Sequence, residues 1–482
     1  MNALINPATA LLIVPLIAAP VLVLVPWYRV AAWINMAAAF LTLGAALSLL
    51  VWRPGWLGPM LAIDDLNIVF LVLNALVGFT TAVFGYGYLA HEIESGRLKR
   101  ANLRFYHPMF QILMAAMNLA LLTSIAGLMW VQVELATLIT ILMVGINRSP
   151  EALEAAWKYF ILGSVGIALA LFGTILVYSA AQPVVGNGLP AMTWTTLVAH
   201  AAAFDPMILN IAFVFLLLGY GTKAGLFPLH AWLPDAHAEG PTPVSAILSG
   251  LLLNLGMYAI LRFKMVLAAN PATIAPGPLL MGLGLLSVLF AGLMLYRRRD
   301  IKRFFAYSSI EHMGIIAFAF GLGGPLANFA GLLHMAMHSL TKSGLFFTIG
   351  NITRLKGTQK LAAITGLTSS HPVLGWIFVA GVAALAGLPP FGVFTSEFLI
   401  VTSAFAHQPV LAVILVIGLM ICLGALFLRL NGVAFGAPSP DKSTHIGPVW
   451  PMLLHLGLVL AAGIFIPVAM AEWFRHVAKL LG

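Results

Sequence analysis

The chain has 482 residues, of which 61% are hydrophobic and only 8% are charged. Because an average soluble domain carries about a quarter of its residues as Asp, Glu, Lys or Arg, this composition excludes a water-soluble globular protein. The net charge of +9 is dispersed over short segments between apolar runs, which argues against nucleic acid as a partner. Cys422 is the only cysteine, so the sequence excludes an intrachain disulfide and any thiolate cluster for zinc or for iron and sulfur.

Serial apolar runs predict a membrane protein, since about 20 apolar residues cross the ~30 Å hydrocarbon layer as one helix. We predict an all-α fold, with residues 1–482 as a single polytopic membrane domain of about 14 transmembrane helices. The apolar stretch 109–146 is too long for one crossing, and we divide it near Gly127. The predicted spans are 9–26, 30–51, 66–89, 109–127, 129–146, 156–181, 208–229, 244–267, 276–295, 301–321, 326–350, 372–405, 410–431 and 449–470.

The distribution of lysine and arginine indicates the orientation. Of the 24 such residues, 17 lie in the loops after odd-numbered spans or near the span ends beside them, and five lie likewise after even-numbered spans or in the C-terminal tail. Because cytoplasmic loops hold the excess of positive charge, we predict a bacterial inner-membrane protein with both termini on the non-cytoplasmic side. The two remaining residues, Lys223 and Lys342, fall inside apolar spans.

A short similarity between two segments of the chain predicts an inverted repeat. The segment Ala-Gly-Leu-Phe-Pro228 in span 208–229 resembles Ala-Gly-Leu-Pro389-Pro390 in span 372–405. The two spans are the seventh and the twelfth, so they cross in opposite directions and the second copy is upside down, and proline inside a span indicates a broken helix. We therefore predict helix breaks at Pro228, Pro389 and Pro390.

Four charged residues are predicted to lie within the membrane: Glu134, Lys223, Lys342 and Glu397. Unpaired in lipid, each would cost about 2.5–3.5 kcal/mol, or very roughly 10 kcal/mol together, so they must be paired or hydrated. Intramembrane ionisable groups are functional by default, and the alternative is a set of buried structural ion pairs.

Span 326–350 carries His334, His338 and Lys342 at i, i+4 and i+8, on one helix face over ~12 Å. With water between them, such groups form a proton relay through part of the membrane. Zinc ligation is the competing interpretation of paired histidines. Since no nearby carboxylate or thiol on this helix completes a ligand set, we predict neither metal nor cofactor on this chain.

The segment after Lys223 contains two prolines and a glycine, which break the helix and free backbone carbonyls. Such backbone is tolerated only where it lines a cavity, so we expect Lys223 to face one. Residues 235–243 are interpreted as a polar cap that leaves the membrane. In span 301–321, Glu311 is interpreted as an interfacial residue, and His312 fits a relay group or a packing residue equally well.

Three motifs resemble a known family: Gly225-Leu-Phe-Pro-Leu-His-Ala-Trp-Leu-Pro-Asp-Ala-His237, Arg303-Phe-Phe-Ala-Tyr-Ser-Ser-Ile-Glu-His-Met-Gly314 and His334-x3-His338-x3-Lys342. The chain resembles the antiporter-like proton-channel subunits of respiratory complex I, of membrane-bound [NiFe] hydrogenases and of multisubunit sodium/proton antiporters. It looks most like the hydrogenase-4 component F branch and is also similar to subunit M of NADH-quinone oxidoreductase. The resemblance implies inverted five-helix repeats, which we place at residues 109–269 and 276–432 as two half-channels.

The resemblance also implies residue roles. Glu134 would pair with Lys223, Lys342 would be the central relay group, and Glu397 would end the second half-channel. Subunit M has a lysine where Asn254 stands here, and asparagine cannot titrate, so Lys342 or water and histidine must link the halves. The candidate proton-transfer residues are Glu134, Lys223, His230, His312, His334, His338, Lys342 and Glu397.

The expected function is proton translocation by a non-catalytic membrane subunit of a redox-driven complex. No phosphate-binding loop is present, so energy must come from partners: other membrane subunits and a peripheral redox arm with iron–sulfur clusters and, in a hydrogenase-type complex, a [NiFe] centre. One alternative is a sodium/proton antiporter subunit that works without redox chemistry. The second alternative is a non-conducting membrane scaffold.

Overall fold

The computed structural model describes residues 6–53, 58–96, 98–444 and 446–482, so Arg97 of the charge count lies outside the described residues. Within these residues the chain forms helices and connecting segments, with no β-strand. The helices are α1 (Pro7–Leu24), α2 (Tyr28–Ser48), α3 (Asp65–Glu94), α4 (Arg100–Leu122), α5 (Ala126–Val144), α6 (Pro150–Val185), α7 (Trp194–His200), α8 (Pro206–Ala224), α9 (Leu233–Glu239), α10 (Thr242–Ile247), α11 (Leu253–Ala268), α12 (Gly277–Arg297), α13 (Ile301–Leu322), α14 (Gly324–Lys356), α15 (Leu367–Ser370), α16 (Pro372–Leu385), α17 (Gly392–His407), α18 (Pro409–Ala434), α19 (Trp450–Ile464) and α20 (Val468–Leu480).

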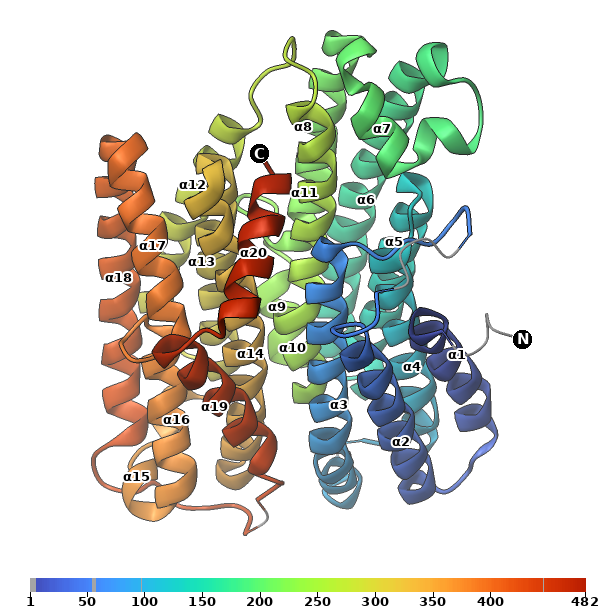
Figure 1. Cartoon of the computed structure of the whole chain (residues 1–482). Helices are drawn as coiled ribbons and strands as arrows, with labels where there is room; N and C mark the ends of the chain where they lie inside the picture. The colour runs from blue at the N-terminus through green and yellow to red at the C-terminus, as the bar shows by residue number, and fades with distance from the viewer. Residues whose placement is uncertain (1–5, 54–57, 97, 445) are drawn as a thin grey trace.

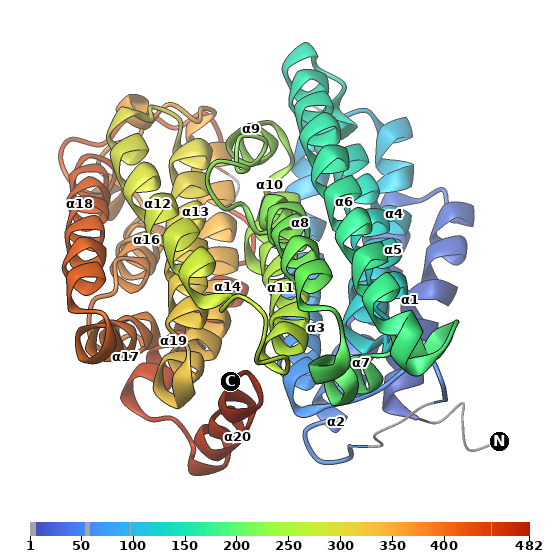
Figure 2. The ribbon, with the colours of Figure 1, turned by 90° about the horizontal axis from the view of Figure 1, so that it is seen from above.

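The long helices run side by side along one direction of the molecule (Figure 1). Seen along that direction, α12, α13 and α16 to α18 lie on one side and α1 to α6 on the other (Figure 2). Helix α14 joins the two sides, since it packs against α3 and α10 as well as α13, α16 and α17. Residues from both halves of the chain therefore meet around α14.

Eleven of the described helices are long and apolar enough to cross a membrane, or twelve if the bent pair α19 and α20 forms one span. This finding confirms an all-helical membrane protein, while the number 14 stays a prediction. The 33-residue helix α14 is not among the eleven, and α16 has only 14 residues. The stretch 109–146 is divided at residues 123–125, close to the predicted division at Gly127.

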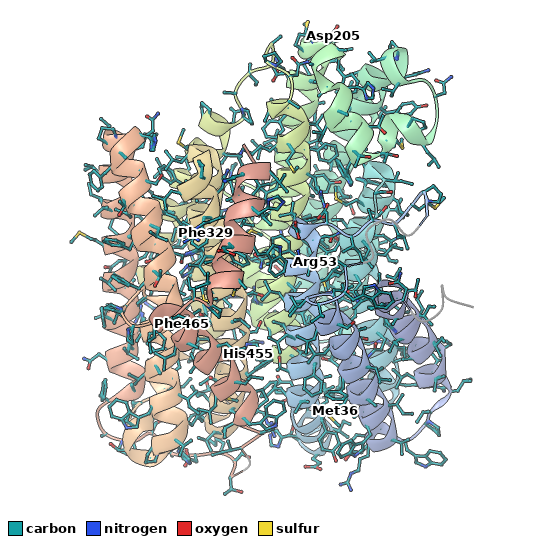
Figure 3. The ribbon with its side chains drawn as sticks, in the orientation of Figure 1. Met36, Arg53, Asp205, Phe329, His455 and Phe465 are labelled. Carbon is teal, nitrogen blue, oxygen red and sulfur yellow. The ribbon has the colours of Figure 1, made fainter. Side chains whose placement is uncertain are left out.

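The last predicted span, 449–470, is not one straight helix. Helices α19 and α20 meet at an angle of 83°, and Phe465 lies at the bend (Figure 3). Pro467 explains the break, because a proline disfavours helical geometry in the residue before it and cannot donate a backbone hydrogen bond.

Both predicted helix breaks are present. Helix α8 ends at Ala224, and no helix resumes until α9 begins at Leu233, so Pro228 lies within the break. Helix α16 ends at Leu385 and α17 begins at Gly392, with Pro389 and Pro390 between them. The sequence thus predicted correctly where these two apolar segments lose their helical hydrogen bonds.

Glycines bring α12 and α13 into close contact. A Cβ atom on Gly284 would lie 2.6 Å from the carbonyl oxygen of Gly314, and one on Gly314 would lie 2.7 Å from the carbonyl oxygen of Gly284. Lipid supplies little hydrophobic drive for helix association, so close backbone packing at small residues is a main source of attraction in a membrane. This contact fixes the position of α13.

We predict that Gly284→Ala lowers the thermal unfolding midpoint of the purified protein, because its methyl group would overlap the α13 backbone. Overpacking of this kind costs about 1–3 kcal/mol. Gly282→Ala is the matched control, since a Cβ atom there meets no atom within 4 Å, and alanine favours the helix by up to ~1 kcal/mol. Intrinsic-fluorescence melting in detergent measures both, and equal midpoints for the two variants would contradict the packing described here.

Candidate functional site

Glu134, which is partly buried, and Lys223, which is buried, lie together on α5 and at the end of α8. The Lys223 Nζ atom is 4.0 Å from Glu134 Oε2, and the lysine side chain is 1% exposed. This separation is longer than a hydrogen bond, so the two groups attract each other without direct proton sharing. The pair that the sequence suggested only through a resemblance is thus present as a contact.

The break after α8 places Lys223 in the last turn of a helix. Gly225 ends the helix in a left-handed conformation (φ +72°), and its N–H donates to the carbonyls of Gly221 and Thr222. The indole N–H of Trp232 also donates to the Thr222 carbonyl, at 2.9 Å. The negative end of the helix dipole therefore lies at Lys223 and favours its positive charge.

Aromatic and small residues shape the space around Lys223. Its Nζ lies 5.9 Å from the centre of the Tyr159 ring, which stacks on Trp232 with 4.0 Å between ring centroids. The Tyr159 hydroxyl is hydrogen-bonded to Thr140 at 2.9 Å. A Cβ atom on Gly163 would lie only 3.1 Å from Nζ, so a larger residue there would crowd the ammonium group.

Lys342 is held by the neighbouring helix α13. Its ammonium group donates to the carbonyl of Phe305 at 2.6 Å and to the hydroxyl of Ser308. The side chain is fully buried. No salt bridge to Lys342 is found among the described residues, so neutral oxygen atoms of α13 supply its direct hydrogen bonds.

Three histidines continue from Lys342 along α13 and α14. His312 Nδ1 and His334 Nε2 are 2.9 Å apart, and His334 Nδ1 is 2.9 Å from the hydroxyl of Ser396 on α17. The ring of His338 lies 5.4 Å from that of His312. His312 is buried and in contact with His334, so it belongs to this cluster. Both roles that the sequence suggested for it, a relay group and a packing residue, are compatible with this position.

Glu397 lies beside this cluster, on the first turns of α17 after the break. Nitrogen atoms of His312 and His334 and a carboxylate oxygen of Glu397 all lie within 4.8 Å of one another. The carboxylate lies over Gly387, where a Cβ atom would overlap its oxygen and where the backbone has φ +63°. Glycine is required in the break for both reasons.

The prediction that no metal binds here considered only ligands on the helix of His334 and His338. The fold supplies a different set, because His312 comes from α13 and Glu397 from α17. Spacing along one helix could not reveal it, since the three ligands belong to three helices.

His230 is the predicted residue that the structure does not bring to the others. It is buried among the rings of Phe227, Phe290 and Tyr307, with centroid distances of 5.6, 4.8 and 6.2 Å. Among the described residues, no hydrogen bond joins it to another candidate proton-transfer residue. Its aromatic surroundings suit a packing role.

Two residues were underrated from sequence. Glu311 is buried, not interfacial, because α13 begins at Ile301 and so carries it halfway along the helix, next to Cys422. His237 is fully buried and stacks on Phe346, one turn of α14 from Lys342, with 4.8 Å between ring centroids. The sequence around His237 resembles a polar cap, and its burial became evident only from the fold.

Asn254 stands where subunit M has a lysine, and its hydrogen bonds within the described residues go to backbone carbonyls and not to Lys342. Its amide donates to the carbonyls of Gly250 at 3.3 Å and of Met335 at 3.2 Å, linking α11 to α14. A π-helical turn, Leu248–Leu252, precedes it, and such turns frequently occur at functional sites. Between Lys223 and Lys342, the described side chains form no continuous chain of hydrogen bonds.

A polar cavity lies at the end of α9, on the side of the molecule where α13 begins. Its volume is about 260 Å³, and Glu239 and Lys302 contribute to its wall. Lys302 donates to the carbonyls of Ala238 and Gly240, at 2.9 and 2.6 Å. Burial raises the pKa of the Glu239 carboxyl, although Lys302 and Arg303 oppose this effect.

Comparisons with known proteins agree with this geometry. A family model described as "NADH:quinone oxidoreductase/Mrp antiporter, TM" matches residues 126–422. The chain is 59% identical over 474 residues to a hydrogenase-4 component F homolog of Methylacidiphilum infernorum, covering 98% of this chain and 99% of that protein.

Two solved structures share the fold. A chain of the membrane-bound sulfane sulfur reductase, an archaeal respiratory membrane complex, matches with a TM-score of 0.87 at 23% identity and covers 98% of this chain and 97% of its own. A chain of the Mrp complex from Dietzia sp. matches with a TM-score of 0.83 at 22% identity, covering 99% and 97%. These matches show the fold alone. With the family model and the 59% identical relative, the resemblance is confirmed, and the chain belongs to the NADH:quinone oxidoreductase/Mrp antiporter family of membrane subunits.

Proposed function

We propose that this chain translocates protons across the bacterial inner membrane as a non-catalytic subunit of a redox-driven complex, of the hydrogenase-4 or complex I type. The observation that carries the proposal is that Lys223 and Lys342 are buried, each with specific partners. Buried lysines are costly in a membrane protein and are retained where protons or ions pass. The similarity to a hydrogenase-4 component F homolog supports this assignment.

We further propose fourteen crossings arranged as two inverted half-channels, residues 109–269 and 276–432, with both termini on the non-cytoplasmic side. The first half-channel contains Glu134 and Lys223. The second contains Lys342, the three histidines and Glu397. The two helix breaks support this division, because each lies beside one of these groups.

The Glu134–Lys223 pair acts as a switch in this proposal. While the carboxylate is 4.0 Å away, it stabilises the ammonium form by about 4 kcal/mol at an effective dielectric constant of ~20. Separation of α5 and α8 removes that attraction and leaves a desolvated ammonium group, which favours release of the proton. The energy is comparable with the ~2.3 kcal/mol per 100 mV that a proton meets in crossing an energised membrane.

The cavity at the end of α9 is the proposed entrance to the second half-channel. Glu239 collects protons there, and His237, two residues earlier in α9, is fully buried against Phe346, one turn of α14 from Lys342. From Lys342, protons pass to His338, His312 and His334 and then to Glu397.

Partners supply the energy. We predict that the affinity-tagged chain, solubilised in mild detergent, co-purifies with an [NiFe]-hydrogenase-like large subunit and iron–sulfur proteins, identified by mass spectrometry. Recovery of only other small membrane proteins, together with sodium-dependent pH changes in inverted vesicles without electron donors, would instead identify a sodium/proton antiporter subunit.

We predict that Lys223→Ala abolishes proton translocation, at least tenfold below wild type, while electron transfer by the complex is partly retained. The substitution removes the cation that Glu134 stabilises. Dye quenching in inverted vesicles measures translocation, and donor oxidation measures electron transfer. Lys264→Ala is the control, because Lys264 is a buried lysine that binds the carbonyl of Leu481 instead. Undiminished pumping by Lys223→Ala would contradict the switch.

We predict that His237→Ala slows translocation at least tenfold, since it removes the titratable ring that packs against Phe346, one turn of α14 from Lys342. His200→Ala is the control, because that histidine is exposed and hydrogen-bonded within its own helix. If His237→Ala pumps at the wild-type rate in a complex that assembles normally, protons do not enter through this cavity.

A further inference from the structure

A potential metal site lies inside the second half-channel. His312, His334 and Glu397 come from α13, α14 and α17, and their ligand atoms lie within 4.8 Å of one another. Two imidazoles and one carboxylate are a ligand set that Zn²⁺ and similar divalent cations accept, with a fourth position left for water. We propose that this cluster binds a divalent cation of the zinc class, and that the bound cation blocks proton passage.

Hydrogen bonding orients His334 for ligation. The hydroxyl of Ser396 donates to the carbonyl of Val393 at 2.8 Å, and it has only one proton to donate. Its contact with His334 Nδ1 at 2.9 Å must therefore be one in which it accepts, so Nδ1 carries the ring proton. The lone pair of His334 Nε2 then points at His312 Nδ1. A second ring N–H held in this way is what metal-binding histidines have.

His312 presents the matching nitrogen. Its Nδ1 faces His334 Nε2 at 2.9 Å, close enough for one proton to lie between them. A tetrahedral metal ion with bonds of about 2.0–2.2 Å keeps ligand atoms ~3.3–3.6 Å apart, so it can replace that proton if the rings separate by about half an ångström. The other ring nitrogen, Nε2, has no hydrogen-bond partner among the described residues, so it can carry the ring proton once Nδ1 binds the metal.

Glu397 completes the set. A carboxylate oxygen lies within 4.8 Å of a nitrogen of each imidazole, so coordination requires the side chain to change rotamer and move toward the two rings. The absence of a Cβ atom at Gly387 provides the room for this carboxylate. One negative charge offsets part of the charge of the cation, which lowers the cost of placing it in the interior.

The blocking effect rests on the proposed proton path, whereas binding does not. A cation between His312 and His334 removes the proton-sharing contact between them. It also adds positive charge one helical turn from Ser308, which binds the ammonium group of Lys342. Proton transfer along this line is therefore prevented while the metal is bound.

The binding test uses the purified full chain in detergent, with Zn²⁺ in titration calorimetry and Co²⁺ absorption as a second probe. We expect one site per chain and a tetrahedral Co²⁺ spectrum. His334→Ala and Glu397→Gln should each weaken binding at least tenfold, and Ser396→Ala about tenfold through the lost ring orientation. His230→Ala is the matched control, a buried histidine outside the cluster, and should bind as wild type does.

Thermal melting of each variant checks that it is folded. Wild-type affinity in the folded variants Glu397→Gln and His334→Ala would overturn the site, as would equal weakening by His230→Ala. Ser396→Thr, which keeps a hydroxyl, should restore the binding that Ser396→Ala loses.

The blocking test measures proton translocation by the wild-type complex in vesicles at increasing Zn²⁺. Half-inhibition at the concentration that half-fills the site supports the block. Full translocation with the site filled overturns the block but leaves the metal site in place. A complex that translocates no protons even without Zn²⁺ contradicts the proposed function, and the calorimetry still decides the site.

Discussion

The burial of the Lys342 ammonium group is the constraint on which the rest of the structure depends. An ammonium group in an apolar interior needs oxygen atoms around it, and here α13 supplies them through the Phe305 carbonyl and the Ser308 hydroxyl. These contacts require α13 to lie against α14 in one register, which also brings His312 to His334. Helix α13 is in turn positioned by its glycine contacts with α12. Close helix packing at residues that carry no charge thus determines how charged and titratable residues meet.

The two helix breaks follow a common physical logic. A helix that ends inside the membrane leaves carbonyl groups that need partners, and the chain provides them locally. At α8 the Trp232 indole donates to the Thr222 carbonyl. The negative end of the helix dipole lies next to Lys223 and stabilises its positive charge. At α16 the break supplies Gly387, whose missing side chain leaves space for Glu397. Each break therefore stabilises or makes room for the ionisable group beside it.

Sequence reasoning predicted the features that depend on composition and local chemistry. The apolar runs predicted where the main helices lie, and the prolines predicted both helix breaks. The cost of placing charge in lipid identified Lys223 and Lys342 as candidate functional residues. It could not predict which helices touch, because apolar helices offer few signals of pairing. His237 and Glu311 were underrated for that reason: their local motifs suit a surface, and their burial follows from contacts with distant segments. The bend at Pro467 was missed because hydropathy continues through it.

Two clusters of ionisable residues differ in the interactions that stabilise their protonated forms. The first is the Glu134–Lys223 pair, and the second consists of Lys342, the three histidines and Glu397. Glu134 and Lys223 interact at 4.0 Å through charge alone, and this energy changes gradually as the helices move. Lys342, His312 and His334 are held by hydrogen bonds of 2.6–2.9 Å, which weaken steeply once their geometry changes. A small displacement of α5 relative to α8 can therefore alter protonation of Lys223 without breaking any hydrogen bond between the two groups. In the proposed path through the second cluster, a proton would move only when a donor exchanges its partner. Rotation of the Lys342 side chain and of the imidazole rings would then set the pace of transfer there, and movement of helices would set it in the first cluster.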